Sequence, residues 1–363
     1  MMTHIRIYQF AALALVLVFV GSCRKGFVEP CPPDEAVGTE YVFPSMPFFP
    51  AMDIPENNPL TVEKIELGRF LFWEKALSGD NTMSCGTCHS PASNFSDPEQ
   101  FSVGITGEVG NRHSMALINL GWAPNFFWDG REQTLEDQVV DPVANPIEMN
   151  QDWDEALEEI AAIDIYPAMY VDAFGSTEVT KTRTAKALAS FLRSMVSYQS
   201  KFDKSRILQA TLTPEEQHGL DLFITEGAAP LFGADCFHCH GFGAMQFADY
   251  LPHNNGLDSV FTDLGYGGVS GDPLQMGKFK TVTLRNIELS GPYMHDGRFT
   301  TLEEVVAHYN SGGLPSATID PFMKYTDGGL SLSEQSQSDI ISFLKTLTDT
   351  AFTQNPAFQD PFQ

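Results

Sequence analysis

The sequence has few basic residues. It holds 21 lysines and arginines against 47 aspartates and glutamates, a formal net charge of −26, and such a chain would be repelled by nucleic-acid phosphates, so we exclude that partner. Either the acidic surface steers a basic electron donor or it serves ordinary solubility. Long apolar runs are also lacking, because the run from Phe10 to Val20 is too short to span a bilayer.

Cysteine is scarce too, with six residues, yet four of them form two haem-attachment pentapeptides. These are Cys85-Gly86-Thr87-Cys88-His89 and Cys236-Phe237-His238-Cys239-His240. In each, two thiols form thioethers to one porphyrin and the adjacent imidazole binds its iron. This composition yields roughly 0.002 such motifs by chance, so we predict two covalently attached haem c groups. A four-thiolate zinc site is the alternative, but it gives no reason for a histidine after each pair.

The two haem motifs lie in an internal repeat. Gly68–Phe72 precedes Cys85 by the same spacing as Gly219–Phe223 precedes Cys236, and Ser190–Arg193 recurs as Ser342–Lys345. Apolar residues near each closing segment fall on one helical face. We therefore predict a mainly α fold of two tandem cytochrome c-like domains related by internal duplication, with a boundary near residues 204–212.

The N-terminus resembles that of an exported lipoprotein. Arg6 precedes the apolar run, and Val20-Gly21-Ser22-Cys23 resembles a lipobox, which implies cleavage before Cys23 and a lipid anchor on the periplasmic side of a bacterial membrane. With ordinary signal cleavage instead, the protein is soluble in the periplasm and Cys23 is free to pair with Cys31. The predicted organisation is a signal peptide 1–22, a tether and strap 23–59, a peroxidatic domain 60–206, an electron-transfer domain 207–352 and a C-terminal tail 353–363.

Five separated segments resemble the bacterial dihaem cytochrome c peroxidase family, including its MauG-type branch. They are Phe127–Arg131, Gln138, Asn145–Met149, Leu284–Asn286 and Gly291–Phe299. The order, spacing and identity of these segments agree with the family from about residue 45 to residue 350. The resemblance implies two haems, a peroxidase activity and hydrogen peroxide as substrate.

The resemblance also implies roles for individual residues. The haem on His89 is the peroxidatic centre and the haem on His240 the electron-transfer centre, with Trp128 placed between them as a relay. Glu148 and Gln138 match the distal residues above the first haem. A carboxylate there can take a proton from peroxide and return it to the leaving oxygen, whereas an amide can only position peroxide by hydrogen bonds. The plain alternatives are a core aromatic for Trp128 and a solvated surface group for Glu148.

Two departures from other family members stand out. Those members bring a second histidine to the peroxidatic iron, but no histidine lies between His89 and His113, and residues 102–108 hold no good iron ligand. We therefore expect the first haem to be open to peroxide. Tyr309 stands seventeen residues after Pro292, where others have a methionine ligand and MauG-type enzymes a tyrosine. Competing ligands for the second iron are His308, Met294, Met276 and Met245.

The expected ligand for the second iron lies in a predicted helix. The pattern from Thr301 to Asn310 predicts a helix that Thr301 and Glu304 cap and that carries Tyr309 in its last turn. A phenolate lowers the potential of a haem and stabilises high-valent iron, whereas a thioether raises the potential.

The family also implies a calcium ion and a histidine near the haems. Ser290 and Pro292 stand where backbone oxygens bind calcium, but His113 replaces the expected asparagine, so Asn111 is the substitute donor. His295 matches the family histidine between the haems. A structural hydrogen bond in a turn is the alternative for His295.

Three functions remain open at this stage. In the first, a small cytochrome or cupredoxin donates two electrons and peroxide becomes water. In the second, the oxidised haems modify a tryptophan or tyrosine on a partner protein. In the third, the chain is a non-enzymatic electron carrier, which leaves Glu148 without a use. The sequence does not identify the oligomeric state, the donor or the protein substrate.

Overall fold

The computed structural model describes residues 37–227, 231–241 and 245–363. The predicted signal peptide, the lipobox with Cys23, and Cys31 lie outside these residues. Asp34–Gln363 forms one compact unit, which is mainly helical and has a single two-stranded sheet among the described residues. No helix in the described part of the chain is long and apolar enough to span a membrane.

The regular elements are short, and loops connect most of them. The α-helices are α1 (Val62–Trp73), α2 (Cys85–Cys88), α3 (Leu135–Gln138), α4 (Asp141–Ala144), α5 (Trp153–Ala162), α6 (Tyr166–Phe174), α7 (Lys181–Ser194), α8 (Lys201–Arg206), α9 (Pro214–Phe223), α10 (Tyr266–Ser270), α11 (Leu302–Ser311), α12 (Glu334–Lys345) and α13 (Thr350–Thr353). The strands are β1 (Pro252–His253) and β2 (Phe279–Lys280), which pair antiparallel. Seven 3₁₀ helices complete the described elements: η1 (Lys75–Leu77), η2 (Pro91–Ser93), η3 (Leu120–Trp122), η4 (Cys236–His238), η5 (Pro273–Gln275), η6 (Ile287–Leu289) and η7 (Pro356–Phe358).

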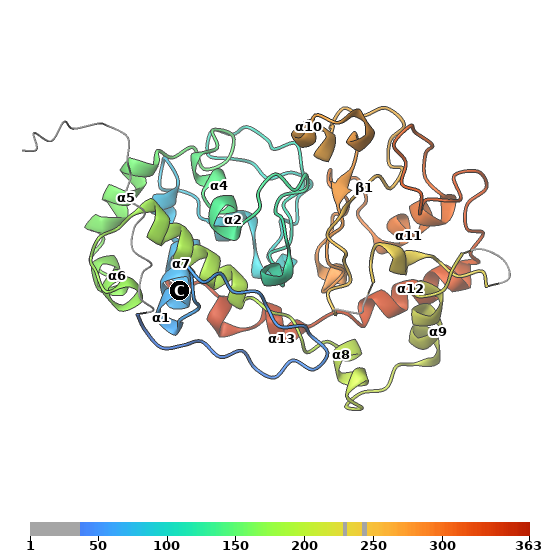
Figure 1. The fold of residues 1–363 in the computed structure, drawn as a ribbon, viewed down its shortest axis with the longest axis horizontal. Helices are drawn as coiled ribbons and strands as arrows, with labels where there is room; N and C mark the ends of the chain where they lie inside the picture. Colours follow the sequence, from blue (N-terminus) through green and yellow to red (C-terminus); the bar gives the residue numbers. More distant parts are fainter. Residues whose placement is uncertain (1–36, 228–230, 242–244) are drawn as a thin grey trace, which may run out of the picture. The chain divides into compact units, whose positions relative to one another are not determined.

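Two helix pairs organise the two halves of the chain. Helix α1 packs on α7 and helix α9 packs on α12, as Figure 1 shows. Each pair meets at a glycine, because a Cβ at Gly68 would collide with the backbone of Ala187, and one at Gly219 with the backbone of Asp339. These two glycines begin the repeated segments that precede the haem motifs, so the repeated spacing has a packing reason.

Each half has its own hydrophobic core. The first core gathers residues from α1, α5, α6 and α7, and Cys85 packs against it. The second core gathers residues from α9, α11 and α12, and Cys236 packs against it. Burial of these apolar side chains is the main force that holds each helix pair together.

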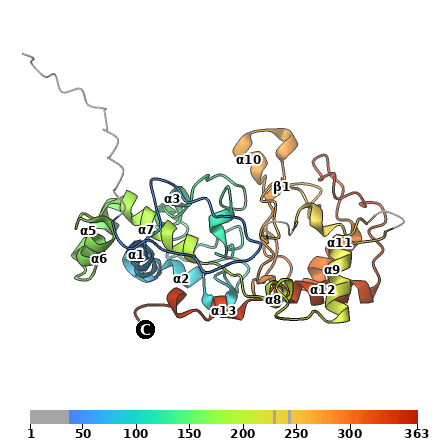
Figure 2. The ribbon, with the colours of Figure 1, turned by 60° about the horizontal axis from the view of Figure 1, so that its bottom comes forward.

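The chain ends cross over between the halves. Phe352 of α13 and Phe358 of η7 belong to the first core, although they follow the second half in sequence (Figure 2). Phe49, from the N-terminal strap, packs against the second core. The predicted tail is thus a packed part of the first half, and each core is contacted by a residue from the far end of the chain.

The predicted helix after Thr301 is confirmed. Helix α11 spans Leu302–Ser311, and Thr301 and Glu304 form the expected capping box. The left-handed Gly312 ends the helix, as is usual at this position.

Candidate functional site

Both haem-motif histidines are oriented in the same way. Nδ1 of His89 lies 2.8 Å from the carbonyl oxygen of Phe95, and Nδ1 of His240 lies 2.9 Å from that of Phe247. Both phenylalanines have a positive φ, which turns their carbonyls toward the rings. When Nδ1–H donates a hydrogen bond to a carbonyl oxygen, Nε2 presents its lone pair to a metal. Burial lowers the pKa of both histidines, so each stays neutral and able to bind iron.

The second motif lines a large cavity with an empty volume of about 1350 Å³. The thiols of Cys236 and Cys239, the imidazole of His240 and the phenol of Tyr309 all lie on its wall. These are the groups that attach and ligate one haem c. The residues present therefore fit the cofactor: the two cysteines would form its thioethers, and His240 and Tyr309 are available to hold its iron.

Among the described residues, the competing iron ligands are mostly elsewhere. Met294 also lines this cavity, whereas His308, Met276 and Met245 do not. The phenolic oxygen of Tyr309 accepts a hydrogen bond from Asn255 at 3.2 Å, and the same amide lies 3.5 Å from the Met294 sulfur. Burial raises the pKa of Tyr309 to about 12, against the lowering effect of Asn255. A phenolate at neutral pH therefore requires a cation such as iron beside it.

The first motif places its thiols next to a carboxylate. Burial raises the pKa of Cys85 to about 12 and also raises that of Cys88, and the charge of Glu148 adds to both shifts. Trp73 covers Gly86, where a Cβ would collide with the indole. Half-buried thiols without a disulfide beside an oriented His89 fit a second covalent haem.

Gln138 and Glu148 lie in one stretch of the chain but not in one helix. Gln138 ends α3, helix α4 follows, and Glu148 comes four residues after α4. Glu148 is half-buried, and its Oε1 accepts a hydrogen bond from Nδ2 of Asn145 at 2.6 Å. Burial raises the pKa of Glu148, while Asn145 and Arg131 partly oppose the rise. The carboxyl group can therefore exchange a proton closer to neutral pH than an ordinary glutamate.

Trp128 connects the two haem regions. It lines the cavity of the second motif, and its indole N–H donates to the carbonyl oxygen of His113 at 2.8 Å. His113 is close enough to His89 to lower the pKa of that imidazole. The backbone N–H of His113 in turn donates to the carbonyl oxygen of His295 at 2.8 Å. Trp128 thus lines the second cavity and hydrogen-bonds to His113, which in turn lies close to His89.

His295 is buried and has an aromatic partner. Its ring stacks on Phe279 with centroids 3.6 Å apart, and it lines the second cavity. Burial lowers the pKa of His295, so the ring is neutral. Stacking and burial account for its position without a chemical role.

A buried lysine beside Trp128 was missed from the sequence. Lys280 is 6% exposed, lines the second cavity and an adjoining one of about 640 Å³, and donates its backbone N–H to the carbonyl oxygen of Trp128. Burial lowers the pKa of Lys280 to about 7, although Asp129 opposes the shift. No local pattern marks a lysine in a short strand as buried.

Of the three residues expected to bind calcium, Ser290 and Pro292 line one cavity, whereas Asn111 does not line it. Ser290 and Pro292 line the smaller cavity with His113, and the Ser290 hydroxyl accepts from Asn94 and donates to the carbonyl of Asn286. Asn111 is exposed.

The zinc alternative disagrees with the structure. A four-thiolate site needs both cysteine pairs around one ion, but Cys85 and Cys236 pack against different cores. Within the described ranges, the one group of side chains with the spacing of metal ligands contains no cysteine.

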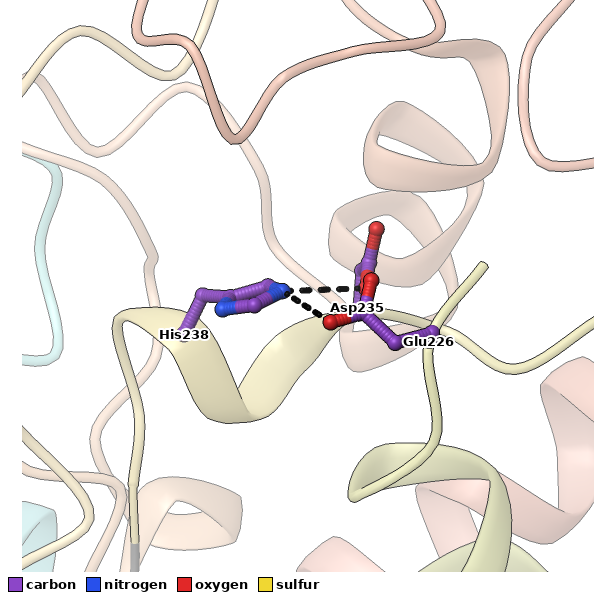
Figure 3. Close-up of side chains that lie close together, drawn as sticks. All are labelled: Glu226, Asp235 and His238. Atoms are coloured by element: carbon purple, nitrogen blue, oxygen red, sulfur yellow. Dashed lines mark ion pairs between the residues drawn. The ribbon is translucent and has the colours of Figure 1, made fainter. Parts of the chain in front are cut away.

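That group consists of Glu226, Asp235 and His238, and it includes part of the second haem motif. Nε2 of His238 lies 3.1 Å from Oε1 of Glu226 and 3.3 Å from Oδ1 of Asp235 (Figure 3). Nζ of Lys324 lies 2.9 Å and 3.1 Å from the other oxygens of the same carboxylates. Lys324 thus supplies a cation to both carboxylates, so its ion pairs explain the cluster without a metal.

A charged histidine, His253, lies near the same motif. His253 contacts Asp320 at 2.6 Å through Nδ1 and Asp249 at 2.9 Å through Nε2. Burial alone would lower the pKa of His253, but the two carboxylates outweigh it and raise the pKa to about 12. A permanent cation therefore lines the wall of the second cavity.

The structure has the features of a di-haem protein of the c type. Each half has an oriented histidine and a pair of thiols beside its own core, and a phenol lines the cavity of the second half. A profile of the family described as di-haem cytochrome c peroxidase matches residues 62–210. The methylamine utilization protein MauG of Methylorubrum extorquens is 35% identical over 81% of this chain and 80% of its own. The cytochrome c551 peroxidase of Nitrosomonas europaea is 31% identical over 82% and 84%.

Solved structures agree with these matches. A MauG-like protein associated with microbial copper homeostasis superposes with a TM-score of 0.81 at 32% identity, over 89% of this chain and 100% of the other. The chain belongs to the di-haem cytochrome c peroxidase family. The resemblance found in the sequence is thereby confirmed.

Proposed function

We propose that this protein reduces hydrogen peroxide to water with two electrons from a small redox protein, a cytochrome or a cupredoxin. As a member of its family it is an oxidoreductase acting on hydrogen peroxide. The observation that carries the proposal is the contrast between the haem sites, because a half-buried carboxylate lies near the first and a phenol faces the second.

The two haems, once attached, supply the redox chemistry that breaks the peroxide O–O bond. In our proposal, Glu148 takes the proton from one peroxide oxygen and returns it to the leaving oxygen, while Gln138 positions peroxide. Two electrons and two protons then convert each peroxide into two waters. Trp128 relays electrons from the second site, where His240 and Tyr309 hold the iron.

A second candidate function is oxidation of a tryptophan or tyrosine on a partner protein. Tyr309 on the wall of the second cavity favours it, because a phenolate ligand stabilises high-valent iron. The likeness to a MauG-like structure at 32% identity also favours this branch. A purely electron-carrying role fits least well, since it gives Glu148 no task.

One assay separates these functions. The holoprotein is mixed with peroxide and a reduced small cytochrome or cupredoxin, and the amount of donor oxidised is compared with the peroxide consumed. We expect two one-electron donors to be oxidised per peroxide. Peroxide consumption that requires a partner protein instead would favour the second function, and no consumption at all would leave an electron carrier.

We further propose that the two halves arose by duplication. Asn119 and Asn286 both have a left-handed backbone, and each side-chain oxygen accepts a backbone N–H, from Ser197 at 2.7 Å and from Asp349 at 2.6 Å. Their backbone N–H groups donate to Met195 and Leu347. Ser197 and Asp349 are 152 residues apart in the sequence, and so are Met195 and Leu347. The repeated segments that begin at Ser190 and Ser342 have the same spacing.

We also propose a lipid anchor at Cys23 on the periplasmic side of a bacterial membrane. Its support is the lipobox-like sequence, and membrane fractionation of Cys23→Ala with palmitate labelling tests it. Label retained by that variant would refute the anchor. A calcium ion at Ser290, Pro292 and Asn111 is a further prediction, and its support rests on the family alone.

A further inference from the structure

The hairpin Ser102–Gly110 lies against the segment that carries Glu148. Two backbone bonds close it, from Gly104 to Glu108 at 2.9 Å and from Gly110 to Ser102 at 3.0 Å. The N–H of Ile105 then donates to the carbonyl oxygen of Glu148 at 3.0 Å. The hairpin therefore holds the backbone of the glutamate directly.

Gly104 makes this approach possible. It is buried, and a Cβ on it would collide with the carbonyl oxygens of Ile147 and Glu148. A larger residue must therefore displace the hairpin or the glutamate segment. Gly110 in the same hairpin differs, because a Cβ there would meet its nearest atom, the carbonyl oxygen of Ser102, at an ordinary 3.6 Å.

The segment is also held from its other side. The N–H of Gly79 donates to the carbonyl oxygen of Met149 at 2.9 Å, and a Cβ on Gly79 would collide with the carbonyl oxygen of Asn150. Close backbone contacts on both flanks leave the segment little freedom to shift.

Asn145 fixes the carboxylate itself. Its Oδ1 accepts the N–H of Ile147 at 3.2 Å, so its Nδ2 must be the atom that faces Oε1 of Glu148 at 2.6 Å. The orientation of the amide therefore follows from the hydrogen bonds. An amide in this orientation donates a hydrogen bond to the carboxylate and favours its charged form.

Few other charges act on this carboxylate. Arg131 and Asp141 do so with opposite signs, and the thiols of Cys85 and Cys88 interact with it. Glu108, the charged residue of the hairpin, is exposed. Asn145 is thus the hydrogen-bonding group that decides how Glu148 lies.

We propose that Gly104, Ile105 and Asn145 form a clamp that positions the Glu148 carboxylate for proton transfer at the first haem. This inference rests on the proposed role of Glu148 and deepens it. The hairpin is then a fixed brace, and the clamp residues are positioning residues that do not touch peroxide.

Two variants test the clamp, each with a matched control. Gly104→Ala pushes on the glutamate segment, and Gly110→Ala is its control in the same hairpin. Asn145→Asp keeps the acceptor for Ile147 but removes the donor to Glu148 and adds a negative charge. Asn150→Asp adds the same charge at an exposed position of the same segment.

Three measurements follow each variant: the stopped-flow rate with peroxide, the pKa of the Glu148 carboxyl by infrared difference spectroscopy, and hydrogen exchange at the Ile105 amide. We expect Gly104→Ala to slow the reaction roughly 10- to 100-fold, as a small displacement of a reacting group does, and to expose the Ile105 amide. Asn145→Asp should slow it and raise the carboxyl pKa by about one unit or more. Both controls should match the wild type.

The clamp and the role of Glu148 fail in different ways. If Glu148→Gln leaves the peroxide rate unchanged, the proposed role of Glu148 is wrong. If Glu148→Gln is slow but Gly104→Ala and Asn145→Asp keep the wild-type rate and carboxyl pKa, the clamp is wrong. If the haem fails to attach in Gly104→Ala, Asn145→Asp alone tests the clamp, because this variant keeps the backbone contacts unchanged.

Discussion

Two similar segments, one in each half, follow an Asp-Gly-Arg turn, but they end differently. After Asp296-Gly297-Arg298 the sequence from Thr301 runs TLEEVVAHY and forms the continuous helix α11, which places Tyr309 on the second cavity. After Asp129-Gly130-Arg131 the sequence from Thr134 runs TLEDQVVDP, and Pro142 stands in the register of Tyr309.

That proline changes the structure of the first half. Helix α3 ends at Gln138, and α4 restarts at Asp141 with Pro142 in its first turn. Proline lacks the N–H that a continuing helix needs, and it fits well in a first turn. After this break the chain places Glu148 near the thiols of Cys85 and Cys88. With the histidines oriented alike, the two sites differ in the group near each motif, a carboxylate at the first and the phenol of Tyr309 at the second.

The largest expected effect tests the first half. Glu148→Gln should leave both haems attached and slow the peroxide reaction by about 10² to 10⁴, the range of a general acid–base group. Burial raises the pKa of Glu148 above that of an ordinary glutamate, so the wild-type rate should fall about tenfold per pH unit below this raised pKa. Stopped-flow mixing across pH measures both. A variant as fast as the wild type would place Glu148 outside the reaction.

The next effect tests the second half. Tyr309→Met should give a His/Met haem whose potential is higher by about 0.1 V or more, within the ~0.8 V range that axial ligands span. Tyr309→Phe offers no ligand atom and should make this haem high-spin. Redox titration and electron paramagnetic resonance measure these changes against the wild type, for which we expect one high-spin and one low-spin ferric haem. A low-spin signal and potential unchanged in both variants would exclude Tyr309 as the ligand.

The sequence predicted what local spacing determines. The pentapeptides, the mainly helical fold and the capped helix after Thr301 follow from short patterns, and that helix is confirmed. Contacts between distant segments could not be predicted in this way. Gly104 reaches Ile147 across the fold, and Phe358 enters a core that begins almost 300 residues earlier. The alignment of Pro142 with Tyr309 could be seen in the sequence. Its structural effect, the end of α3 before α4 begins, could be seen only in the structure.

The crossed chain ends offer a third way to separate the halves. Phe358 is 6% exposed and packs against Phe352 and Phe191 with centroids 5.4 Å and 6.2 Å apart. Phe358→Ala should therefore cost about 3–5 kcal/mol and destabilise the first half. Phe362→Ala is the milder comparison, because Phe362 is 51% exposed and its ring packs edge-on against Phe70 with centroids 5.3 Å apart; it should cost about 0.5–1.5 kcal/mol.

Denaturation followed at the two haem spectra measures this difference. In Phe358→Ala the spectrum of the haem in the first half should change at a lower denaturant concentration, while the haem of the second half keeps its wild-type midpoint. Coincident shifts at both haems would mean that the two cores unfold as one cooperative unit.

The smallest expected effect concerns the helix that distinguishes the second half. The hydroxyl of Thr301 accepts the N–H of Glu304 at 3.2 Å, and the Glu304 carboxylate accepts the N–H of Thr301 at 3.0 Å. Thr301→Ala breaks this capping box and should cost about 1 kcal/mol. Tyr309 lies at the opposite end of α11, where Asn255 contacts its hydroxyl, so the low-spin spectrum should not change. If the spectrum changes with so small a loss of stability, the N-terminal cap of α11 also sets the position of the phenol.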